Sequence, residues 1–153
     1  MNALELKVPP PVVALCLAML MWLVATPALS FTATFGVRVG LAVALAAIGQ
    51  GISIAGIVAF RRARTTVNPL KPDAASALVS GGVYRATRNP MYLGLLVTLI
   101  GWAAWLSNPA ALLFLPIFVL YINRFQIVPE ERALSKLFGA EYAAYKRSVH
   151  KWL

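Results

Sequence analysis

Two short polar segments of this chain contain the residue types that bind charged small molecules, and the first is the run 82–94. In it, Arg85 and Arg88 come just before an Asn89-Pro90 pair. Asparagine followed by proline is a strong signal for a helix start, with the asparagine as the capping residue. A helix N-terminus offers free N–H groups and the positive end of the helix dipole. We therefore expect this part of the chain to attract a carboxylate or a phosphate.

The second polar segment has Tyr121 and Arg124 followed by two adjacent acids, Glu130 and Glu131. The chain has only five acidic residues, so an adjacent pair stands out. If one helix runs through this segment, Tyr121, Arg124 and Glu131 share a face. Two interpretations stay open for the acids. They favour the start of a helix and pair with Arg124 or Arg132, or they lie beside a cationic ligand.

A site with an anion pocket, a carboxylate and aromatic residues suits a zwitterionic small molecule that also has a cationic centre. S-adenosylmethionine is such a molecule, because it combines a carboxylate, an ammonium, a sulfonium and an adenine ring. The spacing of the residues alone does not select it from other molecules of this kind.

The chain has few residues suited to a disulfide, a zinc site or a Ser-His-Asp triad. Cys16 is the only cysteine, which excludes a disulfide within the chain, and His150 is the only histidine. A structural zinc site needs about four cysteine, histidine or acidic ligands, so we expect no metal site. A Ser-His-Asp triad would need His150 and Asp73, which lie far apart in polar segments.

The composition indicates what must position the two polar segments. Of the 153 residues, 60% are hydrophobic and 12% are charged, more apolar surface than so small a soluble domain can hide. The net charge is +9, and the basic residues flank apolar segments, which fits anionic lipid headgroups better than nucleic acid. We expect an all-α integral membrane protein that contacts membrane lipids and forms a single domain, 1–153.

Four apolar segments are expected to span the membrane, at residues 12–29, 39–60, 91–106 and 110–128. At 1.5 Å per residue the first two can cross a hydrocarbon core of about 30 Å. The apolar parts of the last two are short for this distance, and Ser107-Asn108-Pro109 predicts a tight turn between them.

The second apolar segment has small residues at four-residue spacing: Ala47, Gly51, Ala55 and Ala59. Small residues on one face of a membrane helix let another helix approach closely. The stripe therefore indicates helix packing and permits a homodimer.

The distribution of charge predicts the topology. The segment 61–89 and the tail 129–153 are strongly basic, whereas the turns at 30–36 and 107–109 have no charge. The positive-inside rule places both basic segments, and with four spans both termini, on the cytoplasmic side of the cell (inner) membrane. The polar site then lies in a pocket at that side, below the 61–89 loop and the tail.

These two basic segments differ in their patterns. We expect irregular backbone in the 61–89 loop, with one helical turn near 74–79. The tail is amphipathic, with apolar residues at near-helical spacing, and Gly139 is expected to divide it into two helices.

A set of motifs from the second half of the chain resembles the isoprenylcysteine carboxyl methyltransferase and phospholipid methyltransferase superfamily. The resemblance covers about residues 61–153 and implies a membrane methyltransferase that uses S-adenosylmethionine. Its acceptor would be a lipid-like or isoprenoid-bearing small molecule at the cytoplasmic face. The motifs are the run 82–94, Glu130-Glu131, Phe138-Gly139-x-Glu141-Tyr142-x-x-Tyr145, and Thr65-Thr66-Val67-Asn68-Pro69, which is similar to small bacterial members.

In that superfamily an Arg-(His or Asn)-Pro-x-Tyr motif helps to hold the cofactor, and paired acids lie near its amino-acid end. The resemblance implies that Tyr142 and Tyr145 close over the adenosine. We expect catalytic roles for Glu131, Arg124 and Asn89. The expected cofactor-binding residues are Tyr84, Arg85, Arg88, Asn89, Pro90, Tyr92, Leu93, Gly94, Tyr121, Glu130, Glu131, Tyr142 and Tyr145.

One position leaves the acceptor open. The isoprenylcysteine enzymes usually have histidine where this chain has Asn89, whereas phospholipid N-methyltransferases often have Asn-Pro-Met-Tyr, as here. A carboxylate or thiolate acceptor needs no base, but an amine must lose a proton, which Glu131 could take.

Two other functions are compatible with the sequence. Sterol-type membrane reductases, which use NADPH, have a similar Pro-x-Tyr-x-Gly motif, found here at residues 90–94. A non-enzymatic helical subunit or lipid-binding scaffold would tolerate substitutions in the polar segments.

Overall fold

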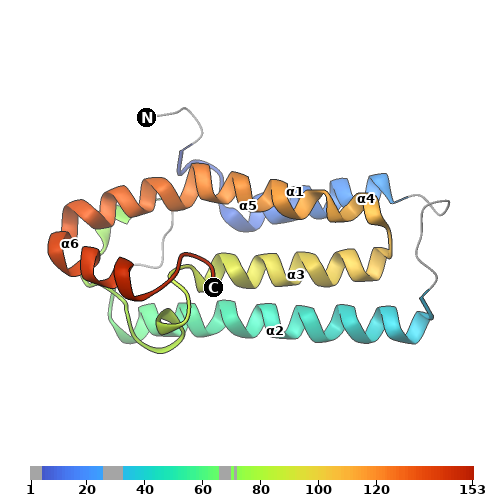
Figure 1. Cartoon of the computed structure of the whole chain (residues 1–153), viewed down its shortest axis with the longest axis horizontal. Helices are drawn as coiled ribbons and strands as arrows, with labels where there is room; N and C mark the ends of the chain where they lie inside the picture. Colours follow the sequence, from blue (N-terminus) through green and yellow to red (C-terminus); the bar gives the residue numbers. More distant parts are fainter. Residues whose placement is uncertain (1–4, 26–32, 66–69, 71) are drawn as a thin grey trace.

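The computed structural model describes residues 5–25, 33–65, 70 and 72–153, and every regular element in these ranges is a helix. Figure 1 shows an elongated bundle of long helices that lie side by side, with α6 folded at one end. In chain order the elements are α1 (Pro10–Val24), α2 (Phe35–Arg62), the 3-10 turns Pro72–Ala74 and Gly82–Arg85, α3 (Pro90–Leu106), α4 (Pro109–Leu112), α5 (Phe114–Ile122), a π-helix (Asn123–Ile127) and α6 (Val128–Ser148).

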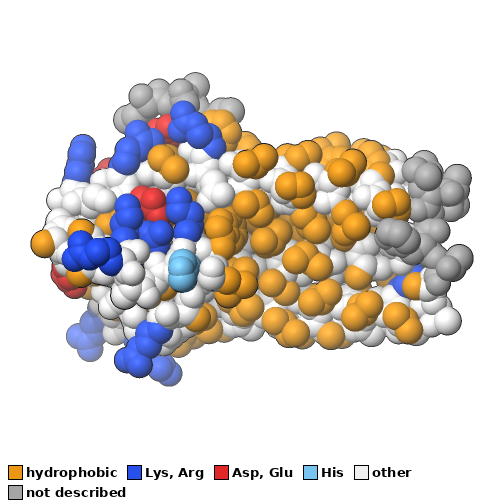
Figure 2. Space-filling view, viewed as in Figure 1, with side chains coloured by type: hydrophobic (Ala, Val, Ile, Leu, Met, Phe, Trp, Pro, Cys, Tyr) orange, Lys and Arg blue, Asp and Glu red, His pale blue; other side chains and the backbone are white. Residues whose placement is uncertain are grey.

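The surface of the bundle is apolar along most of its length. Figure 2 shows hydrophobic side chains over the long body and charged side chains gathered at the end where α6 lies. Large side chains of α1 and α2 are exposed, among them Leu15, Trp22, Val43 and Ile54. Soluble proteins do not expose a continuous apolar band of this kind, so the chain is a membrane protein.

Two helical runs are long and apolar enough to cross a membrane, by length and composition alone. They are α2, with 28 residues, and the run Pro109–Ser148, with 40 residues. The apolar part of the second run ends near residue 128, where the acids and bases of α6 begin. Helices α1 and α3 are shorter apolar helices.

The observed helices differ from the predicted segments at their ends. The helix of the segment predicted at 12–29 begins earlier, at Pro10, because prolines at its first positions suit a helix start, and α1 ends at Val24. The segment predicted at 39–60 extends over Phe35–Arg62, since charged residues at its ends continue the helix. Helix α3 begins at Pro90 rather than 91. Residues 26–32 and 66–69, which include the start of the predicted turn at 30–36 and most of the Thr65–Pro69 motif, lie outside the described residues.

The hairpin after α3 agrees with the prediction, but the fourth segment does not form one regular helix. Ser107 ends α3 in a left-handed conformation, and Asn108 caps α4 by accepting a hydrogen bond from the Ala110 N–H (2.9 Å). The helix predicted at 110–128 is interrupted at Leu113. Pro116 has no N–H group to donate to the carbonyl oxygen four residues before it, which lies next to this interruption.

A π-helix then joins α5 to α6. Pro129 has no N–H to donate to the carbonyl oxygen of Phe125, and that oxygen instead accepts from the Leu6 N–H (3.0 Å). The wider π-turn rotates the helix after it relative to the helix before it. The prediction that Tyr121, Arg124 and Glu131 share one face is therefore wrong.

Glycines allow α2 and α3 to pack closely. A Cβ atom on Gly94 would collide with the Ser53 hydroxyl and the Gly49 carbonyl, and one on Gly49 would collide with Thr98. The predicted stripe lies elsewhere, because Ala47, Gly51 and Ala55 are exposed. Helix α3 thus approaches α2 closely on the face of α2 that contains Gly49, not on the face of the predicted stripe.

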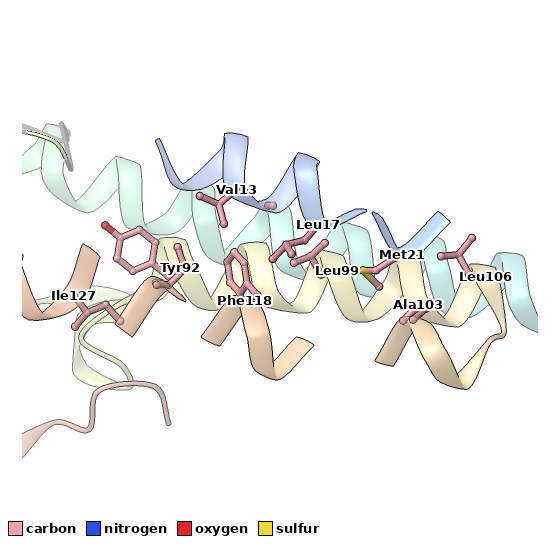
Figure 3. Packing of buried hydrophobic residues seen from close by; sticks show 12 residues of the cluster. Val13, Leu17, Met21, Tyr92, Leu99, Ala103, Leu106, Phe118 and Ile127 are labelled. Carbon is pink, nitrogen blue, oxygen red and sulfur yellow. The ribbon is translucent and has the colours of Figure 1, made fainter. Parts of the chain in front are cut away.

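Helix α1 packs across α3 and α5. Figure 3 shows Val13, Leu17 and Met21 of α1 near Leu99 of α3 and Phe118 of α5. Met21 and Phe118 are fully buried. Because lipid tails are as apolar as these side chains, shape-complementary packing is what holds such helices together.

The polar segments also differ in part from the prediction. Residues 75–80 are not helical, because the Thr65 hydroxyl accepts hydrogen bonds from the N–H groups of Ser76 (2.9 Å) and Ala77 (3.4 Å). The helical turn predicted near 74–79 is therefore wrong. The break predicted at Gly139 is confirmed, since its φ of 47° and ψ of −117° interrupt α6.

Candidate functional site

A cavity of about 100 Å³ lies at the charged end of the bundle. Its walls come from the end of α2, the segment 72–79, the 3-10 turn, the start of α3 and both halves of α6. The lining residues are Phe60, Pro72, Ala75, Ala77, Leu78, Val79, Tyr84, Arg88, Asn89, Met91, Tyr92, Ile127, Glu130, Glu131, Leu134, Tyr142 and Tyr145. The two polar segments that the sequence singles out therefore meet at one place.

Arg88 and Glu131 form an ion pair in the wall of this cavity. Their Nη1 and Oε1 atoms lie 3.0 Å apart, and the side chains are only 11% and 16% exposed. Among the described residues, neither of these atoms nor Arg88 Nε has a hydrogen-bond partner. The predicted pairing of the acids with Arg124 or Arg132 is wrong, because Arg88 occupies that place.

Two lysines add to the positive charge around Glu131. Its Oε2 atom lies 3.6 Å from the Lys151 ammonium and 4.0 Å from that of Lys146. Sequence reasoning missed both lysines, since nothing in a basic tail marks which of its cations fold back. The carboxylate of Glu131 therefore lies among cations from three segments of the chain.

Glu130 has a different environment. The hydroxyl of Tyr92 donates a hydrogen bond to the Oε1 atom of Glu130, and Glu130 lines the cavity. Burial raises the pKa of Glu130 to about 8. Figure 3 shows Tyr92 and Ile127 where the apolar core meets this end of the bundle. The two adjacent acids therefore differ, one paired with cations and the other paired with a phenol.

Aromatic side chains form the rest of the polar wall. The Tyr145 hydroxyl donates to the carbonyl oxygen of Tyr84 (2.8 Å), and Phe60 lies edge-on to Tyr84 with 5.5 Å between ring centres. The guanidinium of Arg88 contacts the hydroxyl of Tyr142, whose pKa burial raises to about 12. These contacts fasten the second half of α6 to the loop before α3.

Asn89 stands at the N-cap position of α3, but its side chain does not cap the helix. Its Nδ2 donates to the carbonyl oxygen of Lys151 (2.9 Å), which also accepts from the Thr87 hydroxyl (3.3 Å). The Arg88 N–H donates to the carbonyl oxygen of His150 (3.0 Å). The predicted cap is therefore wrong in its hydrogen bond, and Asn89 instead anchors the C-terminal residues beside the cavity.

Several predicted site residues lie outside the cavity lining. Arg124 Nη1 pairs with Glu5 Oε1 (3.2 Å), and Tyr121 packs on Phe125 with 4.8 Å between ring centres. Arg85 is exposed, and Gly94 packs against α2. Pro90 and Leu93 are buried in α3 without lining the cavity.

The N-terminal segment braces the π-helix from behind, a feature without any signal in the sequence. The buried carboxylate of Glu5 pairs with Arg124 and with Arg132 (2.8 Å). Fully buried Gln126 donates from Nε2 to the carbonyl oxygen of Val8 (2.7 Å). The turn that orients the two acids is thus held by the N-terminal segment.

A second, larger cavity of about 960 Å³ opens between α1, α2 and α3. Most of its wall is apolar, with Gln50, Ser53 and Thr98 inside it and Arg61 at its polar end. Met91 and Tyr92 line both cavities. The apolar space among the helices and the charged space below them therefore share a wall.

The bundle defines a membrane protein in which a charged cavity adjoins a mostly apolar one. The sequence pattern of the family described as phospholipid methyltransferase matches residues 37–141, and the chain belongs to that family. The matched residues include both polar segments, with the two acids among them. The resemblance to the isoprenylcysteine and phospholipid methyltransferase superfamily is thereby confirmed.

Three curated relatives show what the chain is similar to. An uncharacterized protein of Haemophilus influenzae is 51% identical over 63 residues, 41% of this chain and 100% of the relative. Protein-S-isoprenylcysteine O-methyltransferase A of Arabidopsis thaliana is 31% identical over 102 residues, 67% of this chain and 52% of the relative. Methanethiol S-methyltransferase 1 of Bradyrhizobium diazoefficiens is 42% identical over 67 residues, 44% of this chain and 22% of the relative. The chain spans about half the length of the plant relative.

Proposed function

We propose that this protein is a membrane methyltransferase that uses S-adenosylmethionine and acts on a lipid-like or isoprenoid-bearing acceptor. The observation that carries the proposal is the charged cavity, where Arg88 and Glu131 present opposite charges. Among the described residues, Arg88 Nε and Nη1 and Glu131 Oε1 have no hydrogen-bond partner. Relatives named as methyltransferases favour this function over the reductase alternative.

The residues of the cavity fit the methyl donor. Arg88 would bind the carboxylate of its amino-acid end, since a guanidinium pairs well with carboxylates. Glu131 would bind the ammonium, and Tyr84, Tyr142 and Tyr145 would enclose the adenosine. When bound, S-adenosylmethionine supplies a methyl group on a sulfonium. The residues themselves need only hold and align the reactants and exclude water.

The cavity must enlarge to admit this molecule. Its volume of about 100 Å³ is well below the roughly 300–1,000 Å³ of small-molecule sites. The segment 72–79 is the wall with the least regular structure, held to α2 through Thr65 and Arg64. We propose that this segment moves outward when the donor binds.

The second cavity would take the apolar part of the acceptor. Its wall is mostly apolar and lies among membrane helices, so a lipid chain enters it without crossing water. Because Met91 and Tyr92 line both cavities, the reactive end of such an acceptor would reach the donor there. The acceptor would thus come from the bilayer and the donor from the cytoplasm.

We propose four spans, formed by α1, α2, α3 and α4–α5, with the site at the cytoplasmic face of the inner membrane. Both termini are then cytoplasmic, as the positive-inside rule predicts. The exposed Ala47, Gly51 and Ala55 face of α2 would be the contact of a homodimer.

The three residues expected in catalysis would then act differently. Glu131 would hold the donor. Asn89 would position the C-terminal residues, and Arg124 would position the π-helix through Glu5.

Purified protein in lipid or detergent is expected to bind S-adenosylhomocysteine, the product form of the donor, and to be stabilised by it against heat. NADPH is expected to give no shift. Glu141→Gln, on the exposed side of α6, is a matched control that keeps the binding. Absence of S-adenosylhomocysteine binding in several lipids would overturn the proposed function.

A further inference from the structure

Tyr92 occupies the wall between the two cavities. It is 5% exposed and lines both of them, together with Met91. Its hydroxyl donates a hydrogen bond to Glu130 Oε1. Met91 has no exchangeable proton, so Tyr92 is the shared residue through which a proton can leave the acceptor cavity.

The two acids of the site differ in their fitness as a base. Glu131 already pairs with Arg88 and Lys151, and taking a proton would break those ion pairs. Glu130 makes no ion pair among the described residues, and its hydrogen bond to Tyr92 links it to the acceptor side. This differs from the sequence-based expectation, which assigns the proton to Glu131.

We propose that Tyr92 and Glu130 form a proton-accepting pair at the junction of the two cavities, so that the acceptor loses a proton from an amine or a thiol. The inference rests on the proposed function. An ionised carboxylate would make no use of this pair, because such an acceptor has no proton to give.

The groups that face Glu130 are consistent with this role. They are Tyr92 of α3, Tyr84 of the 3-10 turn, and Glu131 and Tyr142 of α6. No cation is among them, although Arg88 lines the same cavity. A buried carboxyl group whose pKa lies near neutral pH is suited to exchange protons at physiological pH.

The lone pair of the acceptor nitrogen or sulfur forms a bond to the methyl carbon, while the carbon–sulfur bond of the sulfonium donor breaks. The electron pair of that bond stays on the donor sulfur, which becomes a neutral thioether. The acceptor proton moves to the Tyr92 oxygen as the Tyr92 proton moves to the carboxylate of Glu130.

The test compares Tyr92→Phe and Glu130→Gln with wild-type protein and with the control Glu141→Gln. Labelled methyl transfer is measured to three probes: phosphatidylethanolamine, a long-chain alkyl thiol and a farnesylated cysteine carboxylate. S-adenosylhomocysteine binding is measured in parallel by calorimetry. The protonation of Glu130 is followed without donor or acceptor as an infrared carboxyl band that Glu130→Gln removes.

The expected result is transfer to the amine or thiol probe that falls about 100-fold or more in Tyr92→Phe, a loss typical of acid–base catalysis. Binding of S-adenosylhomocysteine to Tyr92→Phe stays within about threefold, a change below 1 kcal/mol. The infrared band is expected to titrate at a pH that shifts in Tyr92→Phe, which a merely structural role would not produce.

Two outcomes overturn the inference alone: unchanged transfer in Tyr92→Phe with intact binding, or preferred methylation of the carboxylate probe. Failure of wild-type protein to bind S-adenosylhomocysteine overturns the proposed function and the inference with it. The amine and thiol arms decide which of the two acceptor groups the enzyme uses.

Discussion

Arg88, just before α3, and Glu131, in α6, meet with Nη1 and Oε1 3.0 Å apart, and both largely buried side chains line the cavity. A buried ion pair is costly to desolvate and contributes little stability by itself. Its value here is that each partner offers a charge to a ligand of opposite sign. The pair therefore predicts which parts of the donor each residue recognises.

Analogues that lack one charge test this assignment. Glu131→Gln is expected to lose its preference for S-adenosylhomocysteine over the analogue without the amino group. Arg88→Gln is expected to lose its preference over the decarboxylated analogue. Each preference is expected to be about 10- to 100-fold in wild-type protein, since hydrogen bonds to charged groups contribute about 1.5–3 kcal/mol. Calorimetric titrations measure it, and swapped or unchanged preferences would contradict the assignment.

Gly94 is expected to matter for packing rather than for binding. Gly94→Ala places a methyl group against Ser53 and Gly49, and overpacking of this kind costs about 1–3 kcal/mol. Thermal unfolding in detergent is expected to occur at lower temperature, while the folded fraction still binds S-adenosylhomocysteine. Gly51→Ala is the matched control, because nothing lies within 4 Å of its added Cβ atom. Lost binding with unchanged stability would instead assign Gly94 to the cofactor site.

The N-terminal brace predicts a long-range effect on the site. Glu5→Gln removes the carboxylate that joins Arg124 and Arg132, so the π-helix is expected to open more readily. Faster hydrogen exchange over residues 123–128 and weaker S-adenosylhomocysteine binding are expected together. Lys7→Gln is the control, because Lys7 is exposed on the same segment. Unchanged exchange in Glu5→Gln would show that the N-terminal segment does not hold this turn.

Binding of the cationic donor S-adenosylmethionine is expected to release a proton from Glu130. Burial raises the pKa of Glu130 to about 8, so at pH 7 the carboxyl is mostly protonated in the free protein. A cationic ligand nearby lowers that pKa, and up to about one proton leaves on binding. Affinity therefore rises with pH toward 8.

Calorimetry in buffers of different ionisation enthalpy counts the released protons. Glu130→Gln is expected to abolish the release and to flatten the pH dependence. The same linkage predicts that Glu130 destabilises the folded protein as pH rises from about 4.5 to 8, since the folded state holds its proton more tightly. Equal heats in all buffers would contradict a cation beside Glu130.

Hydropathy and turn residues predicted much of the fold. The apolar segments, the turn at Ser107 to Pro109 and the break at Gly139 depend on local properties that single residues determine. The bend at the π-helix was not predictable in this way. It depends on a contact between Phe125 and Leu6, and local patterns do not report such distant partners.

The candidate site was predicted in its chemistry more than in its contacts. Residue types alone suggested an anion-binding group and a carboxylate, and the cavity contains Arg88 and Glu131 in those positions. The pairing of cations with acids depends on how the helix rotates at the π-turn. The sequence therefore predicted Arg124 beside the two acids, whereas Arg124 pairs with Glu5. The anchoring of Lys151 by Asn89 depends on where the tail folds back, which its amphipathic pattern does not specify.

The most direct test of the central claim is transfer of a labelled methyl group from S-adenosylmethionine by purified protein in native membrane lipids. We predict label in a lipid-extractable product, at a rate that Glu141→Gln leaves unchanged and that Arg88→Gln and Glu131→Gln reduce strongly. No label above the protein-free control, from protein shown to be folded, would contradict the account.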